Sequence, residues 1–435
     1  MSTYNPYSDK IEEYQIGDNK TLKIGIIGDS QLIDESTYSE FYRKFQENFK
    51  KSLEILKEQK INVLIIDGDI VNVGYELGYD NYLKQFNSVY GNEKKENVPI
   101  LNLVMGNHDY WLKGGRPATV PTEIEEKQKL FEEKTKEKPF SHKVINGYHF
   151  INWSCENGTL EEPITNNEWF EKEIEKALEN NKTKPIFVTT HFPPKNTVYG
   201  SQEWGDERLN KYFKKYPQII NISGHSHYSL IDERSIYQKD YTAIQTQSLS
   251  YIELESGKVN GTIPKDEFNN EMISAKNSMG LICNVDDKKV VIKRISFEKN
   301  KFYGNDWIID VPIDKNNFKY IHEEMEKKSN IPKFVFDNEN DKKVIFNNYT
   351  KTITFKQAFH PNFVHSYKII LRGEDGNKYV YLYFSDFFLM PEDRKKFITL
   401  KLNQYFLGGK YNIKIYAIES FGKESENYIE DIIVV

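Results

Sequence analysis

Cysteine is nearly absent from this sequence. Only two of the 435 residues are cysteines, Cys155 and Cys283, and each lies next to apolar residues in "INWSC" and "LICNV". Isolated cysteines in such surroundings are typical of small buried hydrophobic residues and not of a disulfide framework. We therefore expect both to be buried and unpaired.

Long apolar runs are absent too. No run approaches the roughly 20 residues that a membrane helix needs, and the first residues, "MSTYNPYSDKIEEYQIG", lack the apolar region of a signal peptide. These absences predict a soluble, cytoplasmic protein with no membrane span. A chain from which a signal peptide had been removed would look the same and would be extracellular.

The sequence also lacks an excess of basic residues. It has 59 Lys and Arg against 65 Asp and Glu, a formal net charge of −6, whereas a dedicated nucleic-acid binder carries a basic surface. No nucleic-acid partner is expected, and the lysines of 51–60 are predicted to lie on the solvent side of a helix. With 38% hydrophobic residues, the chain can build a sizeable core, and its length fits two or three domains.

A regular alternation is present between residues 22 and 230. Short apolar runs predict strands buried on both faces, and amphipathic patterns predict helices over 41–59 and 169–178. Alternating strands and helices indicate an α/β domain. The predicted strands are 22–27, 61–66, 99–105, 148–153, 185–190 and 218–223.

The pattern changes after Tyr228 to short strands and turns. Residues 241–312 predict further strands, including a hairpin that turns at Asp286 and Asp287, and they complete a first domain over 1–315. Residues 316–332 predict a helical linker, as part of a helix expected over 314–328. From 333 to 435 the alternation predicts a small all-β sandwich, with strands in 343–348, 352–359, 366–373, 378–385, 396–402 and 410–420.

Five of the predicted strands end in side chains that can bind metals. Ligands bind at the carboxyl ends of strands in open α/β sheets, so these corners are expected to converge. Carboxylates, an amide and imidazoles suit first-row transition metals better than a structural zinc site, which favours cysteine. Taken alone, Asp29 fits an ordinary turn equally well, and His191 fits a buried structural histidine. The corners carry Asp29 and Gln31; Asp67, Asp69 and Asn72; Asn107, His108 and Asp109; His191; and His225 and His227.

The order of these motifs, GD-x-Q, GD-x-x-N, GNHD, H and GHSH, resembles the calcineurin-like metallophosphoesterase superfamily over about residues 22–310. The resemblance implies a four-layer αββα sandwich, followed here by the small all-β domain. It also implies two divalent or trivalent metal ions, Mn, Fe or Zn, with Ca or Mg as alternatives in crystals. The implied reaction is hydrolysis of phosphate monoesters or diesters by a hydroxide that the two metals hold.

The resemblance assigns a role to each motif residue. Asp69 would bridge the metals, and His108 would donate to the leaving oxygen or stabilise the transition state. Asp109 would orient His108, as carboxylates commonly do for imidazoles. The first metal would be bound by Asp29 and His227, and the second by Asn107, His191 and His225.

Gln31 departs from the family pattern, which usually has histidine two residues after the first aspartate. An amide oxygen is a harder and weaker donor than an imidazole nitrogen. We therefore expect Gln31 to make a weaker first metal site, with a bias toward manganese or iron over zinc. The alternative is that Gln31 does not bind metal and hydrogen-bonds a water molecule or the substrate.

Substrate contacts are expected from the loops after two of the corners. Tyr110 and Arg116 follow GNHD, and Lys195 lies in 191–204, a candidate lid. Arg116 could clamp a phosphate, while a solvent-exposed loop charge is the alternative. The expected partner is a small phosphorylated substrate.

Three other functions stay open from the sequence. One is a phosphodiesterase specific for a nucleotide or lipid, and another is a non-catalytic binding protein on a phosphoesterase scaffold. The third is a surface- or polysaccharide-binding protein that acts through the C-terminal domain. That domain resembles a fibronectin type III-like sandwich on the segment "YNIKIYAIESFGKESE" (411–426), which carries no catalytic pattern.

Overall fold

The structure is a computed structural model that describes residues 4–17, 21–159, 166–179, 182–256, 258, 277–402 and 408–435. The chain divides into two compact units, the first ending at His322 and the second consisting mainly of Glu323–Val435. This division falls inside the segment 316–332. Within the described residues, no helix has the length and apolar character needed to cross a bilayer.

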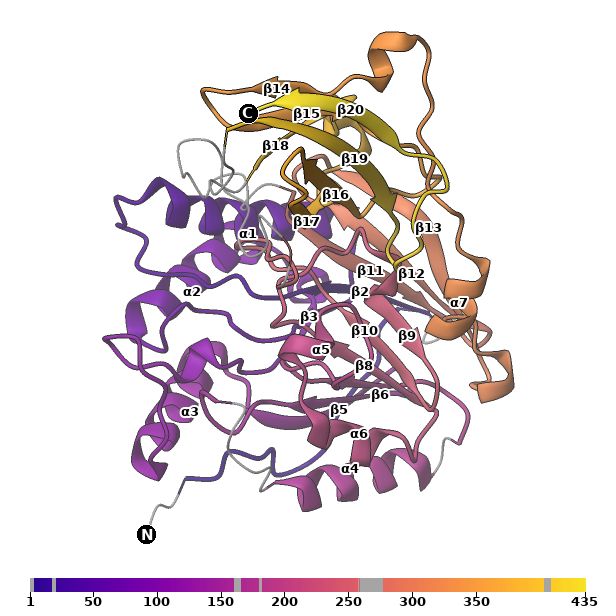
Figure 1. Ribbon diagram of the computed structural model, residues 1–435. Helices are drawn as coiled ribbons and strands as arrows, with labels where there is room; N and C mark the ends of the chain where they lie inside the picture. The colour runs from indigo at the N-terminus through magenta and orange to yellow at the C-terminus, as the bar shows by residue number, and fades with distance from the viewer. Residues whose placement is uncertain are drawn as a thin grey trace. The chain divides into compact units, whose positions relative to one another are not determined.

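Two mixed sheets form the centre of the first unit (Figure 1). One has the order β13-β12-β11-β2-β3-β4 and the other the order β1-β5-β6-β7-β8-β10-β9. Strands β2, β3 and β4 are parallel, as are β6, β7, β8 and β10, so each sheet gathers several strand carboxyl ends at one edge. The strands are β1 Glu12–Tyr14, β2 Leu22–Ile27, β3 Val63–Ile66, β4 Ile100–Leu103, β5 Phe140–Ile145, β6 Tyr148–Trp153, β7 Ile186–Thr189, β8 Ile219–Ser223, β9 Ile236–Gln238, β10 Thr242–Gln245, β11 Met279–Val285, β12 Lys289–Ser296 and β13 Lys301–Asp310.

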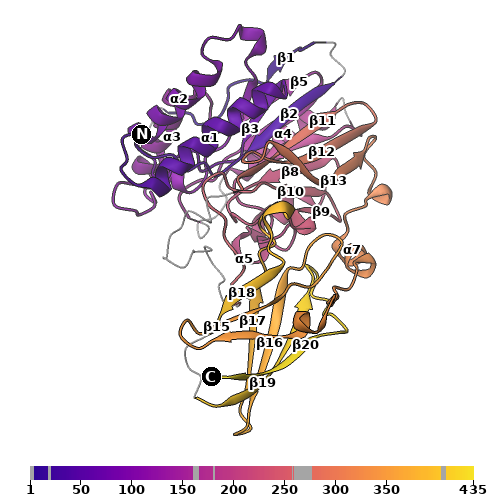
Figure 2. The same ribbon diagram turned by 90° about the horizontal axis from the view of Figure 1, so that it is seen from above.

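Helices cover the outer faces of both sheets. The side of α1 that carries Phe49, Leu53 and Leu56 is buried in one core with Leu64 and Ile66 of β3, and Figure 2 shows α1, α2 and α3 together on one side of β2 and β3. Apolar residues of α4 and α6 share a second core with β6, β7 and β8. The layers are therefore the expected αββα. The helices are α1 Glu40–Glu58, α2 Glu76–Tyr90, α3 Pro121–Thr135, α4 Asn167–Glu179, α5 Ser201–Trp204 and α6 Glu207–Phe213.

The second unit is all-β apart from short helical turns. Its three-stranded sheet has the order β14-β15-β18 and its four-stranded sheet the order β17-β16-β19-β20, and one core joins Phe355 of the first to Tyr367 and Ile413 of the second. The small all-β architecture is as expected, and its fibronectin type III-like character stays a prediction. The strands are β14 Ile345–Asn347, β15 Thr352–Lys356, β16 Ser366–Gly373, β17 Lys378–Phe384, β18 Phe397–Lys401, β19 Lys410–Ile418 and β20 Ile429–Val434.

The helix expected over 314–328 is largely wrong. Only a 3₁₀ turn, Lys315–Asn317, and α7, His322–Lys328, are helical. Gln238 explains the interruption, because its Oε1 accepts hydrogen bonds from the backbone of Lys319 and Tyr320, and its own N–H donates to Tyr320 O. These long-range bonds replace the ones a helix would make.

Two smaller predictions are confirmed. Strands β11 and β12 pair antiparallel on either side of Asp286 and Asp287. Both cysteines are free and Cys283 is buried, as expected, whereas Cys155 is only partly buried.

Candidate metal centre

The polar corners of the two sheets meet at one place in the first unit. Carboxylate oxygens and imidazole nitrogens form two groups, and within each group the atoms lie within 4.8 Å of one another. The first group is Asp29, Asp69 and His227, and the second is Asp69, His191 and His225. Asp69 belongs to both, which is the position that a bridging ligand must take.

The backbone at these corners is strained. Asp29, Gln31, Asp69, His225 and His227 all have positive φ, between 45° and 68°, a conformation uncommon for residues other than glycine. Such strain is found at functional sites, where the surrounding structure holds side chains in a required direction.

Glycines beside the metal-binding candidates make room for them. A Cβ atom on Gly224 would overlap a carboxylate oxygen of Asp29, and one on Gly106 would overlap Asp69. A Cβ on Gly68 would lie 2.5 Å from Nδ1 of His191. The glycines of the GD, GN and GH dipeptides therefore allow the side chains of different corners to approach closely.

Asp69 is buried and only partly satisfied. Its Oδ1 accepts a hydrogen bond of 2.8 Å from the backbone of His108, whereas its Oδ2 has no hydrogen-bond partner among the described residues. Burial alone would raise the pKa of Asp69, but the neighbouring His191 and His108 more than offset this effect and keep the pKa below its usual range. The carboxylate is thus ionised, with one oxygen available to a cation.

His191 faces two oxygens with the same nitrogen. Its Nδ1 lies 2.9 Å from Asp67 O, which fixes the ring, and its Nε2 lies 3.0 Å from Asn107 Oδ1 and 3.3 Å from Asp69 Oδ2. Burial lowers the pKa of His191, but the charges of Asp69 and Asp29 prevail and raise it to about 10. In a neutral ring, Nε2 would present a lone pair to two other acceptors, so this arrangement needs either a proton or a metal ion.

The other two histidines complete the set. Nδ1 of His227 lies 3.0 Å from Tyr251 O, and its Nε2 lies 3.2 Å from Asp29 Oδ1. Burial lowers the pKa of His225 far below its usual value, an effect that the charge on His191 reinforces. No described residue hydrogen-bonds the His225 ring, so a neutral imidazole is available there, and the neutral form is the one that binds metal.

Gln31 is buried with one end of its amide unpaired. Oε1 accepts a hydrogen bond of 3.1 Å from Ser250 Oγ, while Nε2 has no hydrogen-bond partner among the described residues. A hydroxyl can donate or accept, so turning the amide by a half-rotation would keep the contact with Ser250 and leave the oxygen unpaired instead. Gln31 can therefore offer an oxygen to a metal in one orientation and a donor in the other.

His108 lies at the same corner but is oriented differently from our expectation. Nδ1 lies 2.8 Å from Asn72 O, and the ring stacks on Trp111 with a centroid distance of 3.9 Å. Asp109 has no contact with the His108 ring and instead accepts hydrogen bonds from the backbone of Ile70, Val71 and Gly106 and from the Tyr79 hydroxyl. The predicted orienting role of Asp109 is wrong, because these donors saturate its carboxylate.

Removing Asp109 should therefore damage the fold. We expect Asp109→Ala to lower the free energy of unfolding by at least about 3 kcal/mol, since each buried donor left unpaired costs about 1–3 kcal/mol. Urea unfolding followed by circular dichroism measures this. Asp310→Ala is the control, because it removes an exposed carboxylate paired with Lys319 and should cost about 0–1 kcal/mol. Equal costs for the two variants would contradict the structural role of Asp109.

A sixth corner, which we did not predict, supports the other five. It follows β10 and spans Thr246–Tyr251. The Thr246 hydroxyl donates to Asp67 Oδ2 at 2.6 Å, and the Ser248 hydroxyl donates to Asp29 O at 3.0 Å. Burial and the charge of Asp29 raise the pKa of Asp67 well above its usual value, which favours a neutral carboxyl there. The polar run "TQSLSY" after an apolar strand was the available signal.

The three residues expected to contact the substrate have different outcomes. Tyr110 is fully buried, and its hydroxyl donates to Cys155 O at 2.8 Å, so its predicted substrate contact is wrong. Arg116 is an exposed loop charge in a two-bond pair with Glu123. Lys195 lies 3.7 Å from Glu207, and its role stays a prediction.

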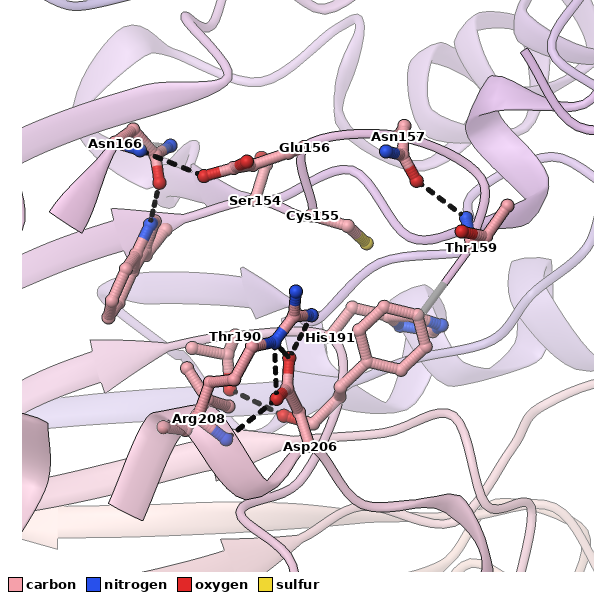
Figure 3. Close-up of a pocket in the computed structure, with 13 residues that line it drawn as sticks. Ser154, Cys155, Glu156, Asn157, Thr159, Asn166, Thr190, His191, Asp206 and Arg208 are labelled. Atoms are coloured by element: carbon pink, nitrogen blue, oxygen red, sulfur yellow. Dashed lines mark hydrogen bonds and ion pairs between the residues drawn. The ribbon is translucent and has the colours of Figure 1, made fainter. Parts of the chain in front are cut away.

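A pocket of about 430 Å³, counting the open space at its mouth, adjoins the metal centre through His191 (Figure 3). It lies among the ends of β6 and β7 and the start of α6, and it combines charged, amide and aromatic side chains. Its lining residues include Cys155, Glu156, Asn157, Asn166, Phe192, Asp206 and Arg208.

One protein-family model matches part of this chain. Residues 22–229, a little under half of the chain, match the model of the calcineurin-like phosphoesterase family. No curated protein matches the chain.

Several solved structures are similar at low identity. The purple acid phosphatase PPD1 of yellow lupin (Lupinus luteus) has 12% identity and a TM-score of 0.44, covering 68% of this chain and 55% of its own. GAP50, the anchor in the inner membrane complex of Plasmodium, has 15% identity and a TM-score of 0.39, covering 68% and 92%. PhoD has 8% identity and a TM-score of 0.38, covering 70% and 73%. With TM-scores below 0.5, only the family match bears on function.

Proposed function

We propose that this chain, whose residues 22–229 form a calcineurin-like phosphoesterase domain, is a hydrolase of phosphate esters that uses two bound metal ions. The observation that carries the proposal is the pair of three-residue groups that share Asp69. Asp29 and His227 would hold the first metal with Asp69, and His191, His225 and Asn107 would hold the second. Gln31 would complete the first site or bind water beside it.

The residues present fit two metal ions. At the second site, His191 Nε2 faces Asn107 Oδ1 at 3.0 Å and Asp69 Oδ2 at 3.3 Å. At the first site, His227 Nε2 lies 3.2 Å from Asp29 Oδ1. A cation at each place would satisfy these acceptors. The Nδ1 atoms of His191 and His227 are each turned toward a backbone carbonyl, the usual way in which a metal-binding imidazole is fixed in its tautomer.

When bound, two such ions supply Lewis-acid activation of water and of the phosphoryl oxygens. With two carboxylates among neutral imidazoles and amides, these residues would leave a net positive charge on two bound divalent ions, which would favour an anionic phosphate. Water adds to phosphorus, the bond from phosphorus to the leaving oxygen breaks, and that oxygen takes up a proton.

His108 would supply that proton. In its imidazolium form, Nδ1–H stays bound to Asn72 O at 2.8 Å, so Nε2–H is free to donate to the leaving oxygen. The Trp111 ring stacks on the imidazole with a centroid distance of 3.9 Å and fixes the orientation of the His108 ring. Trp111 and Asn72 thus take the orienting role that we expected of Asp109.

The activity is tested by reconstituting the protein with manganese, iron or zinc and assaying an aryl phosphate beside a bis-aryl phosphate. Turnover of either ester with a metal present, and none after chelation, is the expected result. Cleavage of the diester alone would favour the phosphodiesterase alternative. Tight metal binding without turnover of either ester would favour a binding protein and contradict the proposal.

Gln31 should weaken the first metal site. We expect Gln31→His to raise zinc affinity at this site by about tenfold or more, because imidazole nitrogen is the better zinc donor, and to leave the second site unchanged. A calorimetric zinc titration that resolves two sites measures this. Two equally tight sites in the unaltered protein would contradict the idea. If Gln31 contacts only water or substrate, Gln31→Ala will change KM and leave metal affinity as it was.

A further inference from the structure

The pocket beside His191 is lined by hydrogen-bond donors that have no acceptor among the described residues. From these donors we infer that the pocket holds the leaving group of the substrate and selects one that carries a carboxylate or a second phosphate. The inference rests on the proposed function, since it places this group next to the phosphate that reacts at the metal centre.

Arg208 is the charged residue of the pocket, and Asp206 fixes its direction. Its Nε donates to both carboxylate oxygens of Asp206, at 2.8 and 3.1 Å, and its Nη2 donates to Oδ2 at 2.6 Å. Its Nη1 has no hydrogen-bond partner among the described residues. Figure 3 shows the guanidinium group of Arg208 facing across the hollow toward Cys155. One donor of a rigidly held cation is thus free to meet a ligand.

Two buried amides add donors of the same kind. Asn157 is 5% exposed, and its Oδ1 accepts from the backbone of Thr159 at 2.8 Å (Figure 3). Asn166 is 4% exposed, and its Oδ1 accepts from Trp153 Nε1 at 2.8 Å. Its Nδ2 is buried with no hydrogen-bond partner among the described residues. Unpaired buried donors are rare in proteins, so the Nδ2 of Asn166 in this pocket indicates a ligand that accepts.

The free donors decide which ligand fits. Three N–H donors suit a group with several acceptor oxygens and no protons of its own, and arginine binds carboxylate and phosphate oxygens most strongly. The lining residues are not positive overall, because Asp206 and Glu156 offset Arg208. Glu156 accepts from the backbone of Asn166 at 2.9 Å. Selectivity for an anionic leaving group would therefore come from these directed hydrogen bonds and not from a long-range electrostatic attraction.

The test compares three substrates on the metal-loaded, full-length protein. Glycerol 3-phosphate carries no second anion, 3-phosphoglycerate carries a carboxylate, and 1,3-propanediol bisphosphate carries a second phosphate. We expect kcat/KM for one or both of the doubly anionic substrates to exceed that for glycerol 3-phosphate by tenfold or more. Whichever probe gains more identifies the source of the anion.

Variants assign the effect to Arg208. Arg208→Gln should raise KM for the preferred substrate by about 10–100-fold, the usual effect of losing a hydrogen bond to a charged group, while kcat and the KM for glycerol 3-phosphate stay near their original values. Arg208→Lys should recover part of the loss. Lys319→Gln is the control, because it removes an exposed cation that is paired with Asp310 and is not among the lining residues, and it should change neither KM.

The outcomes separate the two proposals. If no phosphate ester is turned over with any metal, the proposed function fails. If the enzyme is active but shows no preference for the doubly anionic substrates, or if Arg208→Gln affects all three equally, the pocket is not an anion subsite. A fall in thermal midpoint for Arg208→Gln with unchanged substrate ratios would show that the pair with Asp206 is structural and would overturn the inference.

Discussion

Asp69→Asn is expected to abolish activity by preventing both metals from binding. Asp69 is the only residue common to the two candidate groups among the described residues, and its ionised carboxylate supplies negative charge to both. An amide keeps the shape and loses that charge. Because changes to residues that merely support a ligand cost 10–100-fold in metal affinity, we expect losing the shared ligand to cost more than about 100-fold at each site.

Metal content measured by elemental analysis, together with phosphatase activity, tests this. Circular dichroism should show an intact fold, since the amide oxygen introduced by the substitution can still accept from the backbone of His108. Asp240→Asn is the control, because it alters an exposed carboxylate paired with Lys315 and should leave both metals in place. If Asp69→Asn retains two tightly bound metals, Asp69 does not bridge them.

His108→Ala should keep its full metal content but turn over little substrate, whereas Asp69→Asn loses both metal and activity. The His108 ring belongs to neither metal group, and its Nδ1 is occupied by Asn72 O, so removing the ring leaves the ligands intact. General acid catalysis contributes about 10²–10⁴-fold, and we expect kcat to fall by that factor. The loss should be smaller for an aryl ester with a good leaving group, which needs less protonation.

Trp111→Phe serves as the companion variant. It keeps an aromatic ring against His108 and should lower kcat far less than His108→Ala does. A His108→Ala protein with the kcat of the unaltered enzyme would remove His108 from the mechanism. Loss of metal from that variant would instead indicate that His108 is a ligand.

The sequence predicted the elements that depend on periodicity and on chain order. Apolar runs buried on both faces placed β2, β6, β7 and β8 within one or two residues of their observed bounds. The corners that follow these strands could be predicted to converge, because parallel strands bring their carboxyl ends to one edge of a sheet. Helices α2 and α3 and strand β20 escaped prediction, since polar residues interrupt their apolar patterns.

Side-chain direction was beyond the reach of the sequence. Tyr110 follows GNHD directly, yet it turns into the core and bonds Cys155 O. Asp109 also turns away from its neighbour His108, toward backbone donors nearly 40 residues earlier in the chain. Adjacent residues in a 3₁₀ turn point in different directions, and only the surroundings decide which of them faces the site.

By itself, the sequence determined that acidic, amide and imidazole side chains end successive strands of an α/β domain, because strand order and residue type are local properties. The tertiary structure decided how they combine. It placed Asp69 in both candidate metal groups. It also placed Asn72 and Trp111 against the His108 ring, where they fix its orientation. It also brought Asn157, Asn166 and Arg208 from separate segments to one pocket. These relations depend on contacts between segments that are distant in the chain, which no local pattern encodes.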